Sequence, residues 1–193
     1  MKKSRKYLAA TAIGIFVTIA LMMLASRFYI TQPIPYVPER TSAADLAQLA
    51  NFTRITVSGD FSLEVTQLQD YSIDYAPLND SQGNLQARVE DNTLIISGYG
   101  NRTENNAAVV RIGVPVLDTL EVNYLPEIIV SNFNAPLLNI RLLAFRSFTL
   151  QNSMLGNLDL YSQGEGVVNL RGNTLSNQRL RIEGQSDLNI SPE

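Results

Sequence analysis

Acidic side chains in the second half of the sequence are the residues that could carry catalysis. Asp159 and Glu165, with Arg171 nearby, could place two carboxylates about one strand spacing apart beside a cation, an arrangement used in glycoside hydrolysis. Solvated turn charges explain the same pattern. The sequence contains no Cys and no His, which excludes thiol nucleophiles, Cys/His zinc sites and histidine acid-base catalysis. We therefore expect no enzyme activity, no catalytic residues, no cofactor and no metal.

The charged residues divide the chain into two unlike parts. Lys2, Lys3, Arg5 and Lys6 precede the first apolar run, and all 18 acids follow it. Beyond residue 27 there are ten arginines, so this part carries 10 − 18 = −8. Because such an acidic region repels a phosphate backbone, we expect no nucleic-acid partner.

The apolar run predicts a membrane anchor. Residues 8–25 read LAATAIGIFVTIALMMLA, which is 18 residues without a charge, about 27 Å of helix. We assign a cytoplasmic basic tail to 1–7 and a transmembrane anchor to 8–26, which puts the rest of the chain in the periplasm, outside a bacterial inner membrane. The alternative is a cleaved signal peptide, although 23–25 form a poor cleavage site.

Two short segments precede the folded domain. Residues 27–41 include TQPIPYVPER, whose prolines favour an extended stalk. Residues 42–52 predict a short capping helix, with Thr41 or Ser42 as its N-cap. The domain itself is assigned to 53–193.

The domain is predicted to be all-β because apolar and polar residues alternate from residue 53 onward. The first strands predict an antiparallel meander or a small sandwich. The second half contains apolar pairs at a spacing close to ten residues, which predicts two short strands per twenty-residue coil. Asparagines at the turns could form ladders between coils. We therefore predict a β-solenoid (β-helix) preceded by antiparallel strands; a second antiparallel meander would give the same spacing.

Three segments resemble a known family. The segments FTRITVSGDFSLEVTQLQDYSIDYAP, VEDNTLIISG and VVRIGVPVLDTLEVN look like the opening of the head GIN domain, an auto-transporter adhesin head. The resemblance covers about 52–190. It implies a right-handed β-helix of short strands, usually in a bacterial envelope or exported protein, with no established enzymatic activity. The family's Gly-Ser-Gly turns are replaced here by YLPE, LLAF and NSML, and no functional residue is carried over.

Apolar residues at turn positions predict a partner surface. When the coils are stacked, they would form a hydrophobic strip. The alternative is that they fill a third inner face of the solenoid. The residues of this strip are Tyr124, Leu125, Leu142, Leu143 and Phe145.

The last coil gives a second candidate surface. Leu188 and Ile190 lie in the final apolar pair, where a solenoid exposes an unpaired strand edge unless something covers it. Either the last turns fold over this end, or another chain covers it. Self-association through the open end is one way to cover it.

These features predict a non-catalytic, membrane-anchored scaffold or docking subunit of a bacterial cell-envelope assembly. Its partners would be the inner membrane, through the N-terminal helix, and other envelope proteins. One alternative is a lipid or lipopolysaccharide-transport bridge, which requires inward apolar residues open to a ligand. Another is a carbohydrate-binding, adhesin-like module.

Overall fold

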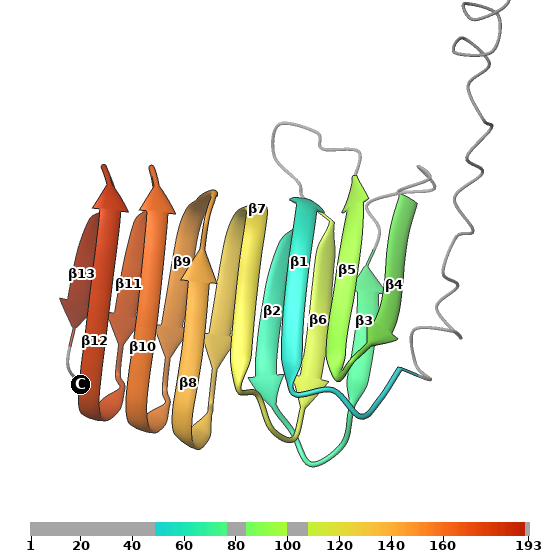
Figure 1. Ribbon diagram of the computed structural model, residues 1–193, viewed down its shortest axis with the longest axis horizontal. Helices are drawn as coiled ribbons and strands as arrows, with labels where there is room; N and C mark the ends of the chain where they lie inside the picture. Colours follow the sequence, from blue (N-terminus) through green and yellow to red (C-terminus); the bar gives the residue numbers. More distant parts are fainter. Residues whose placement is uncertain (1–48, 77–83, 100–107, 192–193) are drawn as a thin grey trace, which may run out of the picture. The chain divides into compact units, whose positions relative to one another are not determined.

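Figure 1 shows the computed structural model of the protein, which describes residues 49–76, 84–99 and 108–191. These residues form thirteen strands and no helix. The strands are β1 (Arg54–Asp60), β2 (Ser62–Gln67), β3 (Ser72–Ala76), β4 (Asn84–Glu90), β5 (Thr93–Tyr99), β6 (Val109–Val114), β7 (Thr119–Ser131), β8 (Asn134–Leu142), β9 (Phe145–Gln151), β10 (Met154–Gly164), β11 (Val167–Arg171), β12 (Thr174–Gly184) and β13 (Asp187–Ser191).

The N-terminal predictions fall outside this region. The basic tail at 1–7, the anchor at 8–26 and the stalk at 27–41 are not among the described residues, nor is most of the capping helix. Its described end, 49–52, is not helical. Within the described ranges, no helix is long and apolar enough to cross a membrane.

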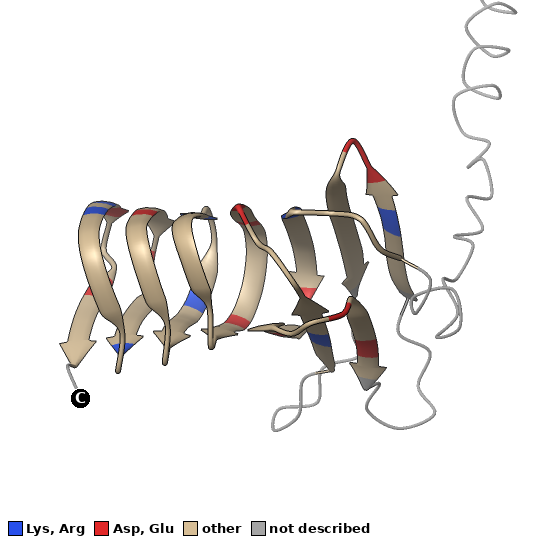
Figure 2. Cartoon of the chain, turned by 90° about the horizontal axis from the view of Figure 1, so that it is seen from below, with Lys and Arg blue, Asp and Glu red and all other residues tan. Residues whose placement is uncertain are grey.

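From β7 onward the chain winds in twenty-residue turns that build a curled, open sheet with two arms. In one arm β8, β10 and β12 pair in parallel, and in the other β9, β11 and β13 do so. Leu160 lies opposite Ile140 on one side and Leu180 on the other. Figure 2 shows successive turns passing from one arm to the other. The predicted twenty-residue repeat is confirmed, and the antiparallel alternative is wrong for these strands.

Each strand of the first arm points three side chains inward, where the sequence pattern indicated two. On β8 the inward residues are Leu138, Ile140 and Leu142, all buried. The equivalent third position of β10 is Ser162, also buried, whose hydroxyl lies 3.3 Å from that of Ser186. On β12 the register differs from the predicted pairing, because exposed Gln178 faces Leu158.

The first half of the domain belongs to the same stack, and the predicted antiparallel meander is wrong for its central strands. β1 lies between β5 and β7, and β2 lies between β6 and β7, in each case with parallel pairing. Only β3 and β4 run antiparallel to their neighbours, β6 and β5. β7 spans both arms, pairing with β1 and β8 and then with β2 and β9.

The apolar pairs of β1 and β2 explain this placement. Ile55 and Leu63 are eight residues apart, as are Leu120 and Ile128 of β7, and each lies opposite its counterpart. All four side chains are buried. Burial of matching apolar positions therefore outweighs sequence order when the strands stack.

The turns between the arms repeat at the same interval. Asn132, Asn152 and Gly172 have φ values of 62°, 52° and 57°, the left-handed conformation that Asn and Gly tolerate best. Elsewhere the asparagines bond between turns: the Asn177 side-chain amide donates to Asn157 Oδ1 at 3.2 Å, and the Asn189 amide to Asn169 Oδ1 at 3.1 Å. A bond between successive turns was predicted for the asparagines at 157 and 177, and it is confirmed there; the bond between Asn189 and Asn169 joins strands β13 and β11 and was not predicted.

Candidate functional site

The predicted hydrophobic strip does not form as a continuous surface. Leu125, Leu142 and Phe145 have exposed fractions of 1%, 0% and 7%, so they are core residues and are unavailable to a partner. Their side chains belong to the buried core cluster, which agrees with the alternative that they fill an inner face. Only Tyr124, 58% exposed, and half-buried Leu143 reach the surface.

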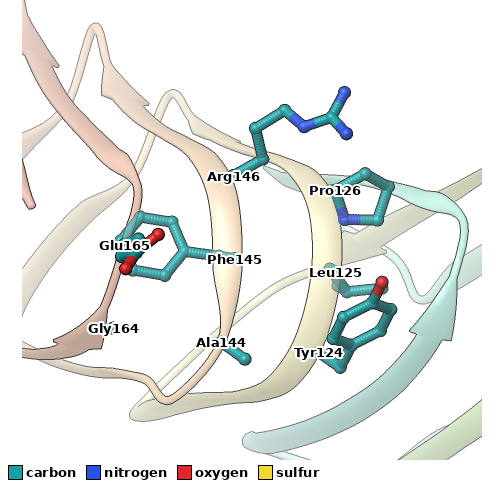
Figure 3. A pocket seen from close by; sticks show the side chains of 8 residues that line it. All are labelled: Tyr124, Leu125, Pro126, Ala144, Phe145, Arg146, Gly164 and Glu165. Atoms are coloured by element: carbon teal, nitrogen blue, oxygen red, sulfur yellow. The ribbon is translucent and has the colours of Figure 1, made fainter.

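A small depression lies beside Tyr124. Its volume is about 310 Å³, and its lining is mainly apolar with two charged ends, Arg146 and Glu165. Figure 3 shows Tyr124 on the same strand as Leu125, and Phe145 on the next turn of the chain. Because Phe145 and Leu125 are buried, they form the floor of this depression.

Leu188 and Ile190 lie on β13, whose single partner among the described strands is β11. They stand opposite buried Val168 and Leu170, yet are 38% and 55% exposed. Their exposure follows from their position in the last described turn, where no strand covers inward-facing side chains.

The carboxylates considered for catalysis do not share a site. Asp159 is on β10, and its carboxylate lies 3.5 Å from the guanidinium of Arg179. Glu165 lines the separate depression beside Tyr124, and Arg171 is at the end of β11 in the other arm. No group of three potential metal-ligating side chains occurs among the residues that the structure describes.

The most organised polar cluster is a row across the outer face of the first arm. Arg141, Tyr161 and Arg181 occupy matching positions on β8, β10 and β12. The guanidinium carbons of the two arginines lie 6.0 Å and 5.6 Å from the centre of the Tyr161 ring. Cation–π attraction at these distances favours the placement of both guanidinium groups beside the Tyr161 ring.

Hydrogen bonds fix one end of this row. The Tyr161 hydroxyl donates to Glu183 Oε2 at 2.8 Å, and Arg181 Nε donates to Glu183 Oε1 at 2.9 Å. The hydrogen bond to Glu183 raises the pKa of Tyr161 above its usual value. The same bond, followed by the one from Arg181, lowers the pKa of Glu183. At neutral pH the cluster therefore contains a neutral phenol and an ionised carboxylate.

The row borders a depression of about 710 Å³, which we call the outer depression. Leu143, from the predicted strip, lies at its edge. The other residues that line the outer depression include three arginines, one acid, one phenol and two amides: Arg141, Arg179, Arg181, Asp159, Tyr161, Asn139 and Gln163. Such a lining suits a polar, negatively charged ligand.

The sequence analysis missed this site apart from Asp159 and Leu143, each of which it assigned to a different candidate site. The available signal was the placement of Arg141, Tyr161 and Arg181 at exact twenty-residue intervals, each next to an inward apolar position. A search for matching residues at ten-residue spacing does not find these three, because strands ten residues apart in the sequence belong to opposite arms.

Comparisons with known proteins concern mostly the described domain. The family model "Putative auto-transporter adhesin, head GIN domain" matches residues 51–192. The comparison with curated proteins gives no match. A solved structure of a "putative cell adhesion protein" from Clostridium sporogenes is 12% identical, with a TM-score of 0.35, and the alignment covers 74% of this chain and 94% of that one. A "putative adhesin" from Bacteroides fragilis is 12% identical, with a TM-score of 0.31 and coverages of 75% and 94%.

Proposed function

Because the chain belongs to the head GIN domain family, we propose that it is a non-catalytic, adhesin-like binding module of the bacterial cell envelope. The stacked turns act in this proposal as a short right-handed β-solenoid that presents one flat outer face. Parallel pairing at twenty-residue spacing supports the solenoid assignment. A rigid stack suits binding, since side chains on strands keep fixed spacings.

The observation that carries the proposal is the ordered row of Arg141, Tyr161 and Arg181 beside the outer depression. Arginine and tyrosine dominate the energetics of many binding surfaces. Here they are ordered by one another before a ligand arrives, which reduces the entropy lost on binding.

The alternative of a lipid-transport bridge gains little support, because among the described residues the exposed inward apolar side chains are confined to the last turn, at Leu188 and Ile190. That function requires inward apolar side chains that are open to a lipid. The inward residues Leu120, Leu138 and Leu160 are 0% exposed and pack in one core cluster between the arms. The outer depression is lined mainly by polar residues instead.

Binding is tested with the full-length protein in lipid nanodiscs on an array of surface glycans and extracellular-matrix proteins. We expect the wild-type protein to be retained, and Tyr161→Ala with Arg181→Ala to lose at least about tenfold in affinity. The matched control is Glu64→Ala with Arg111→Ala, which removes an exposed cross-strand pair, 3.0 Å apart, from the other arm. The proposal fails if nothing is retained, or if both double variants lose affinity equally.

We also propose that the N-terminal segment anchors the protein in the inner membrane, with the domain in the periplasm. The chain contains no cysteine, so single cysteines report topology without background. In spheroplasts, a membrane-impermeant maleimide is expected to label Thr174→Cys, and to label Ser4→Cys only after lysis. Equal labelling of both variants would contradict this topology, and a mature protein lacking residue 4 by mass would indicate cleavage.

A docking role is a second candidate, favoured by the exposure of Leu188 and Ile190. If a second copy covers this end, the full-length protein extracted in mild detergent forms particles larger than one chain. Ile190→Lys is then expected to reduce them to single chains, whereas Leu137→Lys, on the exposed part of β8, leaves them unchanged. Single-chain particles for the wild-type protein would rule out this self-association.

A further inference from the structure

We infer that the outer depression binds an acidic saccharide, whose carboxylates contact the guanidinium groups that line it. This inference rests on the proposed function and adds the chemical class of the ligand. Its basis is the charge of the depression, the availability of its arginines and the polar groups beside them.

The outer depression is positive on an otherwise acidic part of the chain. Its lining includes three arginines, Arg141, Arg179 and Arg181, and one acid, Asp159, which gives 3 − 1 = +2 for the lining itself. Two further carboxylates adjoin the row: Glu183, which is paired with Arg181, and Glu121, which lies opposite Arg141 on β7. Residues beyond position 27 carry −8 in total. A local reversal of sign attracts an anionic ligand to this place and disfavours it elsewhere on the domain.

Two of the arginines are available to a ligand. Arg141 forms no ion pair with a described residue, and its guanidinium is held by the Tyr161 ring at 6.0 Å. Arg179 is paired with Asp159 at 3.5 Å, but its side chain is 82% exposed, and pairs of this kind contribute little. A ligand carboxylate can therefore bind to the guanidinium group of either arginine. Each guanidinium can hold a carboxylate through two parallel hydrogen bonds.

The spacing of the row favours an extended ligand. Arg141 on β8 and Arg181 on β12 are separated by β10, so their strands are two spacings, about 9–10 Å, apart. An oligomer with repeated acidic groups can place one carboxylate at each guanidinium, and it would then lie across the strands along the stack.

Uncharged groups in the depression favour a saccharide over a simple polyanion. The amides of Asn139 and Gln163 and the hydroxyl of Thr119 line the same space, and each can both donate to and accept from sugar hydroxyls. The volume of about 710 Å³ is within the range of small-molecule sites.

The test uses tetragalacturonate and its methyl ester, which has the same sugars without the charge. Binding to the full-length protein in nanodiscs is measured by titration calorimetry at 50 and 500 mM salt. We expect the acid to bind at least about tenfold more tightly than the ester, and its affinity to fall with salt. Arg141→Gln should weaken binding of the acid about tenfold. Arg171→Gln removes an exposed charge on the other arm and should leave binding of the acid unchanged.

Equal binding of acid and ester would overturn the inference, as would equal losses from Arg141→Gln and Arg171→Gln. Octaglutamate binding as tightly as tetragalacturonate would also overturn it, because charge alone would then suffice. These failures are separate from failure of the proposed function. Retention on the array that depends on Tyr161 would still stand if its ligand were neutral or a protein.

Discussion

Phe148→Ala is expected to lower the free energy of unfolding by about 3–5 kcal/mol. Phe148 is 0% exposed and lies opposite Ile128 of β7 and Val168 of β11. Removing the ring leaves a cavity between three turns of the stack, and strands held on both sides cannot move together to close it. The loss is a large fraction of the stability of an ordinary domain.

Urea unfolding of the full-length protein, followed by far-UV circular dichroism, measures this effect. Phe148→Leu is the size control and should lose much less, because it keeps most of the buried volume. Tyr124→Ala removes a 58% exposed ring and should change stability by about 0.5 kcal/mol or less. If Phe148→Ala loses no more stability than Tyr124→Ala, the arms do not pack as described.

Gly59→Ala should cost about 3 kcal/mol, the upper part of the range for overpacking. Gly59 lies opposite Gly98 where β1 pairs with β5, with a φ of 154°. A Cβ at this position would overlap the carbonyl oxygen of Gly98 and lie 2.6 Å from the Phe61 ring. A backbone oxygen in a parallel ladder cannot move without breaking the pairing of β1 with β5.

The same unfolding measurement distinguishes this contact from a general sensitivity of β1. Ser58→Ala changes the adjacent residue, whose half-buried side chain can be removed without a clash, so its effect should be within about 0.5 kcal/mol. Comparable losses for the two variants would show that Gly59 and Gly98 are not held in close contact.

The periodicity of the second half predicted its strands well, because burial acts locally through alternation. Val168 and Leu170 point inward, as the alternation indicates, and Asn169 between them accepts a hydrogen bond from Asn189 of the next turn. The position of Leu142 was left between an exposed strip and an inner face, since a third inward residue adjoining a turn looks the same in sequence as an exposed apolar turn. On β12 the polar Gln178 occupies the position opposite Leu158, so the apolar pair visible in the sequence begins two residues later. The last described turn does not need an apolar residue at that position.

The candidate site was largely missed for a related reason. Asp159 was considered as a possible acid, but its partner is Arg179, twenty residues later, rather than Arg171. Arg141 and Tyr161 attract no attention in a linear sequence, since isolated polar residues on strands are ordinary. Their meaning depends on which strands become neighbours.

The sequence by itself determined that the domain is all-β, that its strands recur about every ten residues in the second half, and which apolar pairs of most second-half strands face the core. These properties depend on alternation and turn chemistry within a few residues. The tertiary structure alone decided that β1 and β2 lie between β5/β6 and β7, and that Arg141, Tyr161 and Arg181 form one row. Several parallel registers satisfy the same alternation, and only the packing of a shared core selects among them.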